Sequence, residues 1–274
     1  MDNNQCYINN KFLDYPEAVL HISDLGLQRG YGIFDYFLEM DGRIPFYEDY
    51  LDRFYHSAEM MHLQVPLTRE LLKEKISFIL KSNGFGRSGI KLLLTGGYSD
   101  DLYSPVSSNF MIINIPMKHD PCEFSDGVKL LTLEYGRWWP EVKTTFYLPS
   151  LVMDKRLKDK GAIEVLYYQN GLVTETTRAN FFLVKDGILI TAGDGVLKGI
   201  TRKHVIQVGK EILPVEERPV HLEEIRICDE AFITGTSKHI MPVVEIDEKV
   251  IGNGKPGDWT RKISEAFESY YKII

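Results

Sequence analysis

The sequence predicts an α+β protein built from antiparallel hairpins and helices rather than from a doubly wound parallel sheet. Asp-Gly at 41–42 and at 186–187 and Asn-Gly at 170–171 are hairpin-turn signals between strand-forming residues. Apolar residues at helical spacing follow, for example over 51–61. The sequence contains no GxGxxG or GxxxxGK[ST] stretch, which argues against dinucleotide and P-loop chemistry.

Residues 1–117 are expected to form a small N-terminal α/β domain. Its second helix should begin after a Thr68 cap and end at Asn83-Gly84. In chain order, we expect a strand over 6–13, a hairpin over 34–47, helices over 47–63 and 68–83, and strands over 89–97 and 110–117.

Residues 118–127 are polar and turn-rich, so we place an interdomain linker there. A larger C-terminal domain over 128–274 should follow. Its expected elements are a strand over 128–135, hairpins over 162–176 and 181–191, and helices over 148–160, 201–213, 222–228 and 258–272.

Composition narrows the class of function. The formal net charge is -7 and no basic run stands out, so neither nucleic acid nor a membrane surface is an expected partner. Cys6, Cys122 and Cys228 form neither a disulfide framework nor a zinc-type pair, and no HExxH occurs, so no metal is expected. The N-terminus lacks the features of a secretory signal, and the apolar run over 110–117 is too short to span a bilayer. We therefore expect a cytoplasmic protein.

One lysine stands in an unusual place. The stretch over 140–149, PEVKTTFYLP, sets Lys143 among β-branched and aromatic residues that favour an extended backbone, just before a helix. Such a lysine either points to water or is held, desolvated and reactive, in a pocket.

Other stretches suggest anion binding. LKGITR over 197–202 is a glycine loop leading into a helix N-terminus, where backbone N–H groups suit a phosphate; the alternative is an ordinary cap. A second Gly-Thr turn lies in ITGTSKHIMPV over 233–243. Arg53 lies beside the apolar stripe of its helix and needs an anion, or else snorkels to water. Glu175 follows a hairpin and, if buried, needs a cation or a donor.

A lysine, a carboxylate and several phosphate-binding elements are together what pyridoxal 5'-phosphate needs from a protein. The lysine forms a Schiff base, the carboxylate keeps the pyridine nitrogen protonated, and the backbone turns and an arginine hold the phosphate.

The chain resembles the fold-type IV pyridoxal-phosphate enzymes, which include branched-chain aminotransferases, D-amino-acid aminotransferases and aminodeoxychorismate lyase. The resemblance runs essentially end to end. It rests on RGYGIFDYFLEMDGRIPFYEDYLDRFYHSAEMM, KTTFYLPSLVMDKRLKDKGAIEVLYYQNGLVTETTRANFF, LKGITRKHVI and DEAFITGTSKHIMPV, in that order. It implies a two-domain fold with a β-barrel-like C-terminal domain, the two domains meeting at the cofactor, and a homodimer whose neighbouring loop completes each site.

The resemblance also implies individual roles. Lys143 would carry the Schiff base, Tyr147 would lie near the cofactor's phenolic oxygen, and Glu175 would pair with the ring nitrogen. Asn180 closes the family's Glu-x4-Asn motif. The phosphate would be bound by Arg53 and by donors from Gly199, Ile200, Thr201, Gly235 and Thr236.

Departures from the family pattern bear on the substrate. Phe146 replaces a common asparagine, Thr176 a glycine, and Arg178 a small residue, which adds a cation near the cofactor. The loop over 96–105 lacks the Arg-x-His pair that binds the substrate carboxylate in well-known bacterial D-amino-acid enzymes. The candidate cations for that carboxylate are Arg29, Lys91, Arg137 and Arg178, with Tyr31 and Phe34 as apolar pocket walls; surface solvation or ordinary core packing are the alternatives.

The expected reaction is ping-pong transfer of an amino group from an amino acid to a 2-oxo acid such as 2-oxoglutarate. RGYGIFDYF and LTGGYS resemble a less usual D-amino-acid subgroup, so a D-amino acid is favoured. A branched-chain L-amino-acid aminotransferase, an aminodeoxychorismate lyase yielding 4-aminobenzoate and pyruvate, and a non-catalytic small-molecule-binding relative remain alternatives.

Overall fold

The computed structural model describes residues 4–118, 121 and 126–274. The chain divides into two compact units. Unit 1 comprises Met1–His119 and Val142–Phe146, and unit 2 comprises Asp120–Glu141 and Tyr147–Ile274. Most of the expected linker, 119–120 and 122–125, lies outside the described residues.

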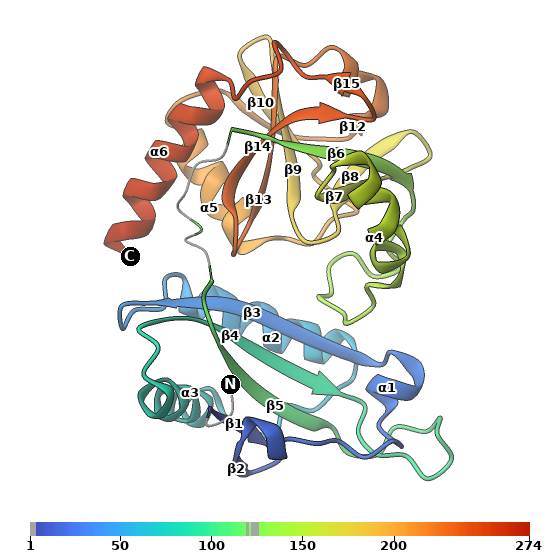
Figure 1. Cartoon of the computed structure of the whole chain (residues 1–274), viewed down its shortest axis with the longest axis vertical. Helices are drawn as coiled ribbons and strands as arrows, with labels where there is room; N and C mark the ends of the chain where they lie inside the picture. The colour runs from blue at the N-terminus through green and yellow to red at the C-terminus, as the bar shows by residue number, and fades with distance from the viewer. Residues whose placement is uncertain (1–3, 119–120, 122–125) are drawn as a thin grey trace. The chain divides into compact units, whose positions relative to one another are not determined.

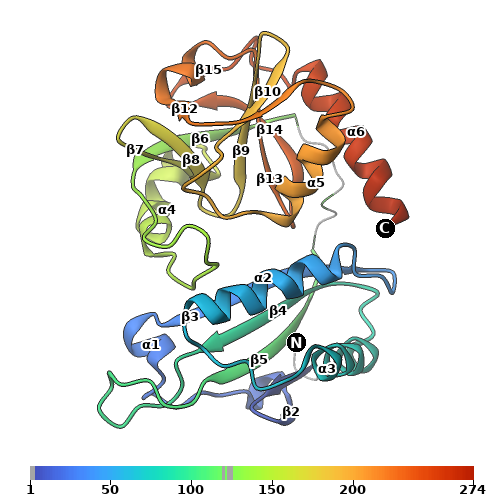
Figure 2. The ribbon, with the colours of Figure 1, turned by 180° about the vertical axis from the view of Figure 1, so that it is seen from behind.

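Unit 1 is a five-stranded antiparallel sheet in the order β2-β1-β5-β4-β3. Figure 2 shows α2 and α3 over one face of this sheet. The elements are β1 (Gln5–Ile8), β2 (Lys11–Asp14), η1 (Tyr15–Glu17), α1 (Leu25–Arg29), β3 (Gly32–Met40), α2 (Tyr47–Met60), α3 (Arg69–Asn83), β4 (Arg87–Thr95) and β5 (Asn109–Pro116).

Local signals account for most of unit 1. The Thr68 hydroxyl accepts a hydrogen bond from Leu71 N, and Gly84 ends α3 in the left-handed conformation, as the sequence predicts. The single strand expected over 6–13 is wrong: Asn9 and Asn10 both have positive φ and turn it into the β1–β2 hairpin. The turn at Asp41-Gly42 is present, but beyond it only an isolated bridge, Met40 to Arg43, forms, and the regular antiparallel partner of β3 is β4.

Unit 2 contains a ten-stranded sheet that closes on itself (Figure 1). Its elements are β6 (Val128–Glu134), α4 (Leu148–Lys160), β7 (Glu164–Gln169), β8 (Leu172–Thr176), β9 (Asn180–Lys185), β10 (Ile188–Thr191), α5 (Ile200–Gly209), β11 (Val215–Glu217), β12 (Val220–His221), η2 (Leu222–Arg226), β13 (Glu230–Gly235), β14 (His239–Ile246), β15 (Lys249–Val250) and α6 (Asp258–Ile273).

The barrel closes where β8 meets β9. The strand path β9-β13-β14-β6-β7-β8 returns to β9 through a pairing of Glu175 with Asn180. Closure removes free edges from these strands, and the interior holds a buried apolar cluster that includes Leu166, Phe181 and Ile233. The expected α+β fold with a β-barrel-like second part is confirmed.

Most boundaries in unit 2 follow the sequence prediction. The turns at Asn170-Gly171 and Asp186-Gly187 have the positive φ angles expected of them. The helix expected over 201–213 ends earlier, at Gly209, and the segment expected over 222–228 is a 3-10 helix. The short helix α1 was not predicted.

Candidate functional site

Lys143 is held against the edge strand of unit 1 by backbone hydrogen bonds. Its carbonyl oxygen accepts from Phe34 N at 3.0 Å, and Thr145 N donates to Gly32 O at 3.0 Å. The expected extended segment therefore contributes only one bridge, between Thr144 and Ile33, and forms no regular strand. Two prolines, at 140 and 149, bracket the segment and limit its length.

The Lys143 ammonium lies over an aromatic ring that it shares with a second lysine. Nζ of Lys143 is 4.7 Å from the Phe34 ring centre, and Nζ of Lys91 is 5.0 Å from it. Burial lowers the pKa of Lys91 below its ordinary value. The two Nζ atoms therefore lie near the same ring, where their positive charges would attract a carboxylate. The structure thus brings three of the predicted site residues together.

Arg53 forms a buried two-pronged ion pair with Asp35 of β3. Nε donates to Oδ2 at 2.9 Å and Nη2 donates to Oδ1 at 2.6 Å. The side chains are 9% and 0% exposed. The pair fixes the orientation of the guanidinium while using two of its five N–H groups. Sequence reasoning missed Asp35, although an acid in the apolar strand GIFDYFLEM is itself a signal for a buried cation.

Glu175 is the centre of a hydrogen-bonded cluster in unit 2. Its Oε1 accepts from Arg137 Nη1 at 2.7 Å, and its Oε2 accepts from Leu197 N at 3.0 Å and from Asn180 Nδ2 at 3.3 Å. The side chain is 5% exposed. These donors satisfy both oxygens of a buried carboxylate and fix its orientation. Leu197 was not predicted, because a backbone donor has no sequence signature.

Arg137 and Arg178, both predicted as substrate cations, have acidic partners within unit 2. Arg137 bonds Glu175 and also donates to Pro140 O at 3.0 Å. Arg178 bonds buried Glu164, whose carboxylate also meets Lys238 Nζ at 2.8 Å. Burial alone would raise the pKa of Glu164, but these two cations outweigh it and the pKa lies below its ordinary value. Neither Glu164 nor Lys238 was predicted.

The glycine loop before α5, which the sequence predicts to be a phosphate-binding cup, leads directly into the helix. Gly199 precedes the helix without a side-chain cap, and a Cβ there would lie 2.1 Å from Asn180 Oδ1. Ile200 and Thr201, the first residues of the ten-residue helix, are buried. Their N–H groups have no acceptor within the helix and lie at its positive end. The cup therefore adjoins Asn180, which in turn bonds Glu175.

The other predicted phosphate turn lies between β13 and β14. Gly235 pairs with His239, and Lys238 N donates to Gly235 O at 3.0 Å, so Thr236 lies at the tip of a tight turn. A Cβ on Gly235 would lie 3.1 Å from Arg178 O, which makes glycine the residue that fits this close approach. Both turns are thus in unit 2.

Tyr147 begins α4 and has a perturbed hydroxyl. Burial raises its pKa to about 12, and Glu175 and Glu164 act in the same direction, while Arg137 opposes them. The phenol is therefore neutral across the physiological range and acts as a hydrogen-bond donor.

The remaining predicted residues lie near the start of β3. Arg29 ends α1 and is exposed, with Nη1 donating to Gln28 O at 2.8 Å. The Tyr31 hydroxyl donates to Met61 O, and burial raises the pKa of Tyr31. Among the described residues, no group of three or more His, Cys, Asp or Glu side chains is arranged to hold a metal ion, and no helix is long and apolar enough to cross a membrane.

Comparison with known proteins identifies the family. The sequence model of the family described as amino-transferase class IV matches residues 32–246. The chain belongs to the class IV aminotransferases. A provisionally named branched-chain-amino-acid aminotransferase of Methanocaldococcus jannaschii is 35% identical, with 96% of this chain and 94% of the relative covered. The D-alanine aminotransferase of Listeria monocytogenes is 27% identical, covering 95% and 93%.

A solved structure supports the fold. The branched-chain amino acid aminotransferase of Escherichia coli superposes with a TM-score of 0.90 at 24% identity, covering 98% of this chain and 95% of that one. The chain is thus a pyridoxal-phosphate-dependent aminotransferase, as class IV members are. Residues of unit 2 fit that cofactor, because this unit combines a buried, cation-paired carboxylate with a glycine-led helix N-terminus.

Proposed function

We propose that this aminotransferase moves the amino group of a D-amino acid to a 2-oxo acid such as 2-oxoglutarate. The structural observation behind the proposed carboxylate site is the shared ring of Phe34, which has Lys91 Nζ and Lys143 Nζ 5.0 Å and 4.7 Å from its centre. Lys91 then binds the substrate carboxylate, with Arg29 as a second cation. The D-alanine aminotransferases among the relatives support the D preference.

Pyridoxal 5'-phosphate, when bound, supplies an aldehyde that captures the amino group and a protonated ring that accepts electrons. We propose that Lys143 holds it covalently and, once displaced by substrate, moves the proton to and from the substrate Cα as general acid and base. Glu175 would pair with the protonated ring nitrogen, while Arg137 and Asn180 bond its carboxylate and orient it.

The phosphate is assigned to donors from both turns and to Arg53. Ile200 N, Thr201 N and the Thr201 hydroxyl lie at the positive end of α5, where an anion is stabilised. The Gly235-Thr236 turn adds further donors, and Arg53 adds a full charge whose orientation Asp35 fixes. Tyr147 would donate its O–H to the cofactor's phenolic oxygen, since its pKa of about 12 keeps it protonated.

A half-reaction screen tests the substrate. The holoenzyme is mixed with D-alanine, D-glutamate or L-leucine, and the cofactor absorbance is followed before 2-oxoglutarate is added. We expect a spectral change with the D-amino acids and its reversal by 2-oxoglutarate. A change with L-leucine alone would overturn the D preference.

A lysine pair tests the carboxylate site. Lys91→Met should raise KM for the amino donor about tenfold to a hundredfold, because a charge-assisted contact is lost. Lys75→Met is the matched control, since Lys75 also lies over a ring of unit 1, Phe12, at 5.5 Å. Equal KM values in the two variants would remove Lys91 from the proposal.

Borohydride reduction followed by peptide mapping should mark Lys143, and an unmarked Lys143 would refute its covalent role.

A branched-chain L-amino-acid aminotransferase is the second candidate, favoured by the 35% identical relative. It uses the same residues, and the screen above separates it through L-leucine. Pyruvate release from aminodeoxychorismate without any 2-oxo acid would instead indicate the lyase.

We also propose a cytoplasmic homodimer with a small N-terminal domain over 1–117 and a larger C-terminal domain over 128–274. Support for the dimer comes from α4, where Leu148, Leu151 and Val152 are 57%, 69% and 72% exposed at helical spacing. Light scattering should give twice the 31.5 kDa chain mass, and Leu151→Glu should shift it toward one chain. A single-chain mass in the unmodified protein would refute the dimer.

A further inference from the structure

Unit 1 contains a pocket of about 570 Å³ that the proposed transamination does not use. One stripe of α3 forms its floor, and the turn after β3 and the start of α2 form its walls. Figure 1 shows α3 at the end of the sheet where β3 stops and β4 starts. The lining residues on α3 recur at helical spacing: Lys73, Ile76, Ser77, Leu80 and Lys81.

The Tyr47 side chain lines this pocket. Its hydroxyl oxygen is buried and has no hydrogen bond among the described residues. Burial raises its pKa, with Glu48 and Tyr55 acting in the same direction, so the group remains a neutral donor at physiological pH. A buried polar atom without a partner is costly and uncommon in folded proteins. The unused O–H donor indicates a ligand that accepts a hydrogen bond from it.

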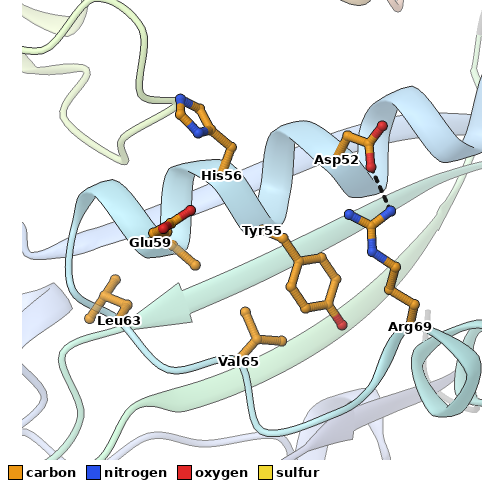
Figure 3. A pocket seen from close by; sticks show the side chains of 8 residues that line it. Asp52, Tyr55, His56, Glu59, Leu63, Val65 and Arg69 are labelled. Atoms are coloured by element: carbon orange, nitrogen blue, oxygen red, sulfur yellow. Dashed lines mark hydrogen bonds and ion pairs between the residues drawn. The ribbon is translucent and has the colours of Figure 1, made fainter.

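A second pocket, which also borders α2, provides a comparison. A pocket of about 460 Å³ beside α2 is also walled by a tyrosine, Tyr55, but that hydroxyl donates to Leu67 O at 2.9 Å. Figure 3 shows its charged lining side chains, among which Asp52 bonds Arg69 at 2.6 Å. The Tyr55 hydroxyl and this ion pair have their partners within the protein, whereas the Tyr47 hydroxyl has no hydrogen-bond partner among the described residues.

A buried carboxylate in the larger pocket adds a second requirement. Glu39 is 6% exposed and accepts from Gly42 N at 2.7 Å and from Ser88 Oγ at 3.2 Å. None of the ion pairs among the described residues includes Glu39. Both neutral donors leave lone pairs available, and a buried carboxylate gains most from a cation. An ammonium group meets that requirement.

Two lysines and an apolar wall complete the pocket. Lys73 and Lys81 line it from α3, and Lys73 also forms an ion pair with Glu48 in the first turn of α2. Ile76 and Leu80 provide hydrocarbon surface between them. The pocket thus offers a carboxylate, a phenol, two ammonium groups and aliphatic contacts, within the size range of small-molecule sites.

We propose that this pocket binds a free aliphatic α-amino acid as a second, non-catalytic site. Its ammonium meets Glu39, its carboxylate meets Lys81, Lys73 and the Tyr47 hydroxyl, and its side chain lies on Ile76 and Leu80. A simple carboxylic acid would leave Glu39 without a cation, and a simple amine would leave the phenol and lysines without an acceptor.

Calorimetry on borohydride-reduced holoenzyme tests this site, because the reduced enzyme cannot turn over. Both enantiomers of leucine and valine are titrated, and at least one should give saturable binding. 4-Methylpentanoate, which lacks the ammonium, and 3-methylbutylamine, which lacks the carboxylate, should each bind at least about tenfold more weakly. No binding by any of the four amino acids, or equal binding by either analogue, would overturn the proposal.

Variants locate the binding within the pocket. Ser77→Leu fills the pocket and should weaken binding at least about tenfold, while Ser82→Leu, also exposed on α3 but outside the pocket, should not change it. Tyr47→Phe should weaken binding about fivefold through one lost hydrogen bond. Equal affinity in the two serine variants would place the amino acid elsewhere and refute the site. The outcome is independent of whether the enzyme prefers D- or L-substrates.

Discussion

Replacing Asp35 with asparagine would remove the carboxylate that pairs with the buried Arg53 guanidinium. The two hydrogen bonds of 2.9 Å and 2.6 Å put the charge centres about 4 Å apart, and at an effective dielectric constant of about 20 their attraction is about 4 kcal/mol. Loss of one partner of a buried pair costs about 3–5 kcal/mol. Asparagine keeps an oxygen acceptor for Tyr36 N but places an NH2 donor where Oδ2 accepts from Arg53 Nε, so the change removes the charge and one acceptor together. We expect the free energy of unfolding of unit 1 to fall by about 3–4 kcal/mol.

The assay must report on unit 1 alone. All three tryptophans, Trp138, Trp139 and Trp259, lie in unit 2, so their fluorescence follows the other unit. Hydrogen exchange of β3 and α2 amides in the apoenzyme, measured by mass spectrometry, follows unit 1. We expect faster exchange there in the variant and an unchanged fluorescence transition.

A surface pair provides the control for this prediction. Asp52→Asn removes an ion pair with the same 2.6 Å contact, but its side chains are 64% and 37% exposed. That variant should lose at most about 1 kcal/mol, because exposed pairs contribute little. If Asp35→Asn and Asp52→Asn altered exchange equally, burial would not be what makes the Asp35 pair strong. Adding pyridoxal 5'-phosphate should restore part of the loss in Asp35→Asn if Arg53 binds the phosphate.

Three further predictions concern unit 2. Hydrogen bonds from Arg218 at 2.9 Å and 2.7 Å lower the pKa of Glu224 to about 2. Because the folded pKa of Glu224 lies below its unfolded value, the pair stabilises the fold fully above about pH 5, and this stabilisation is lost as the pH falls toward 2. Between these pH values, urea unfolding should show the free energy of unfolding of Glu224→Gln falling by about 1–2 kcal/mol less than that of the unmodified protein. Phe182→Ala, at a fully buried ring stacked 4.9 Å from another phenylalanine, should cost about 3–5 kcal/mol in urea unfolding, whereas Ile273→Ala, 78% exposed, should cost almost nothing. Tyr147→Phe should lower kcat/KM about tenfold to a hundredfold, and unmodified activity should show no Tyr147 titration between pH 7 and 10, because its pKa is about 12.

The elements that could be predicted from sequence are those decided by a few adjacent residues. Asn170-Gly171 and Asp186-Gly187 turn their hairpins because both residues of each pair take positive φ, which is a local preference. Thr68 and Gly84 bound α3 for the same reason. Within the candidate site, the same local logic predicted the glycine loop before α5.

The partners of the charged residues could not be predicted, because they come from distant parts of the chain. Arg137 and Glu175 are 38 residues apart, and Arg53 and Asp35 are 18 apart. The sequence indicates that each buried charge needs a partner, but only the barrel and the sheet decide which one. Arg137 therefore changes from a predicted substrate cation to a proposed support for Glu175.

The segment around Lys143 shows why strand propensity alone misleads. Val142–Phe146 has β-branched and aromatic residues, yet it forms a bridge to β3 at one position only, on the edge of β3 that β4 leaves open, and Pro149 lies in the first turn of α4 soon after. What remains is two backbone hydrogen bonds to Phe34 and Gly32. These fix the Lys143 backbone to unit 1, although the chain on either side belongs to unit 2. An anchored backbone of this kind suits the role that we propose for Lys143, because a side chain that is bonded to the cofactor and released again must return to the same place.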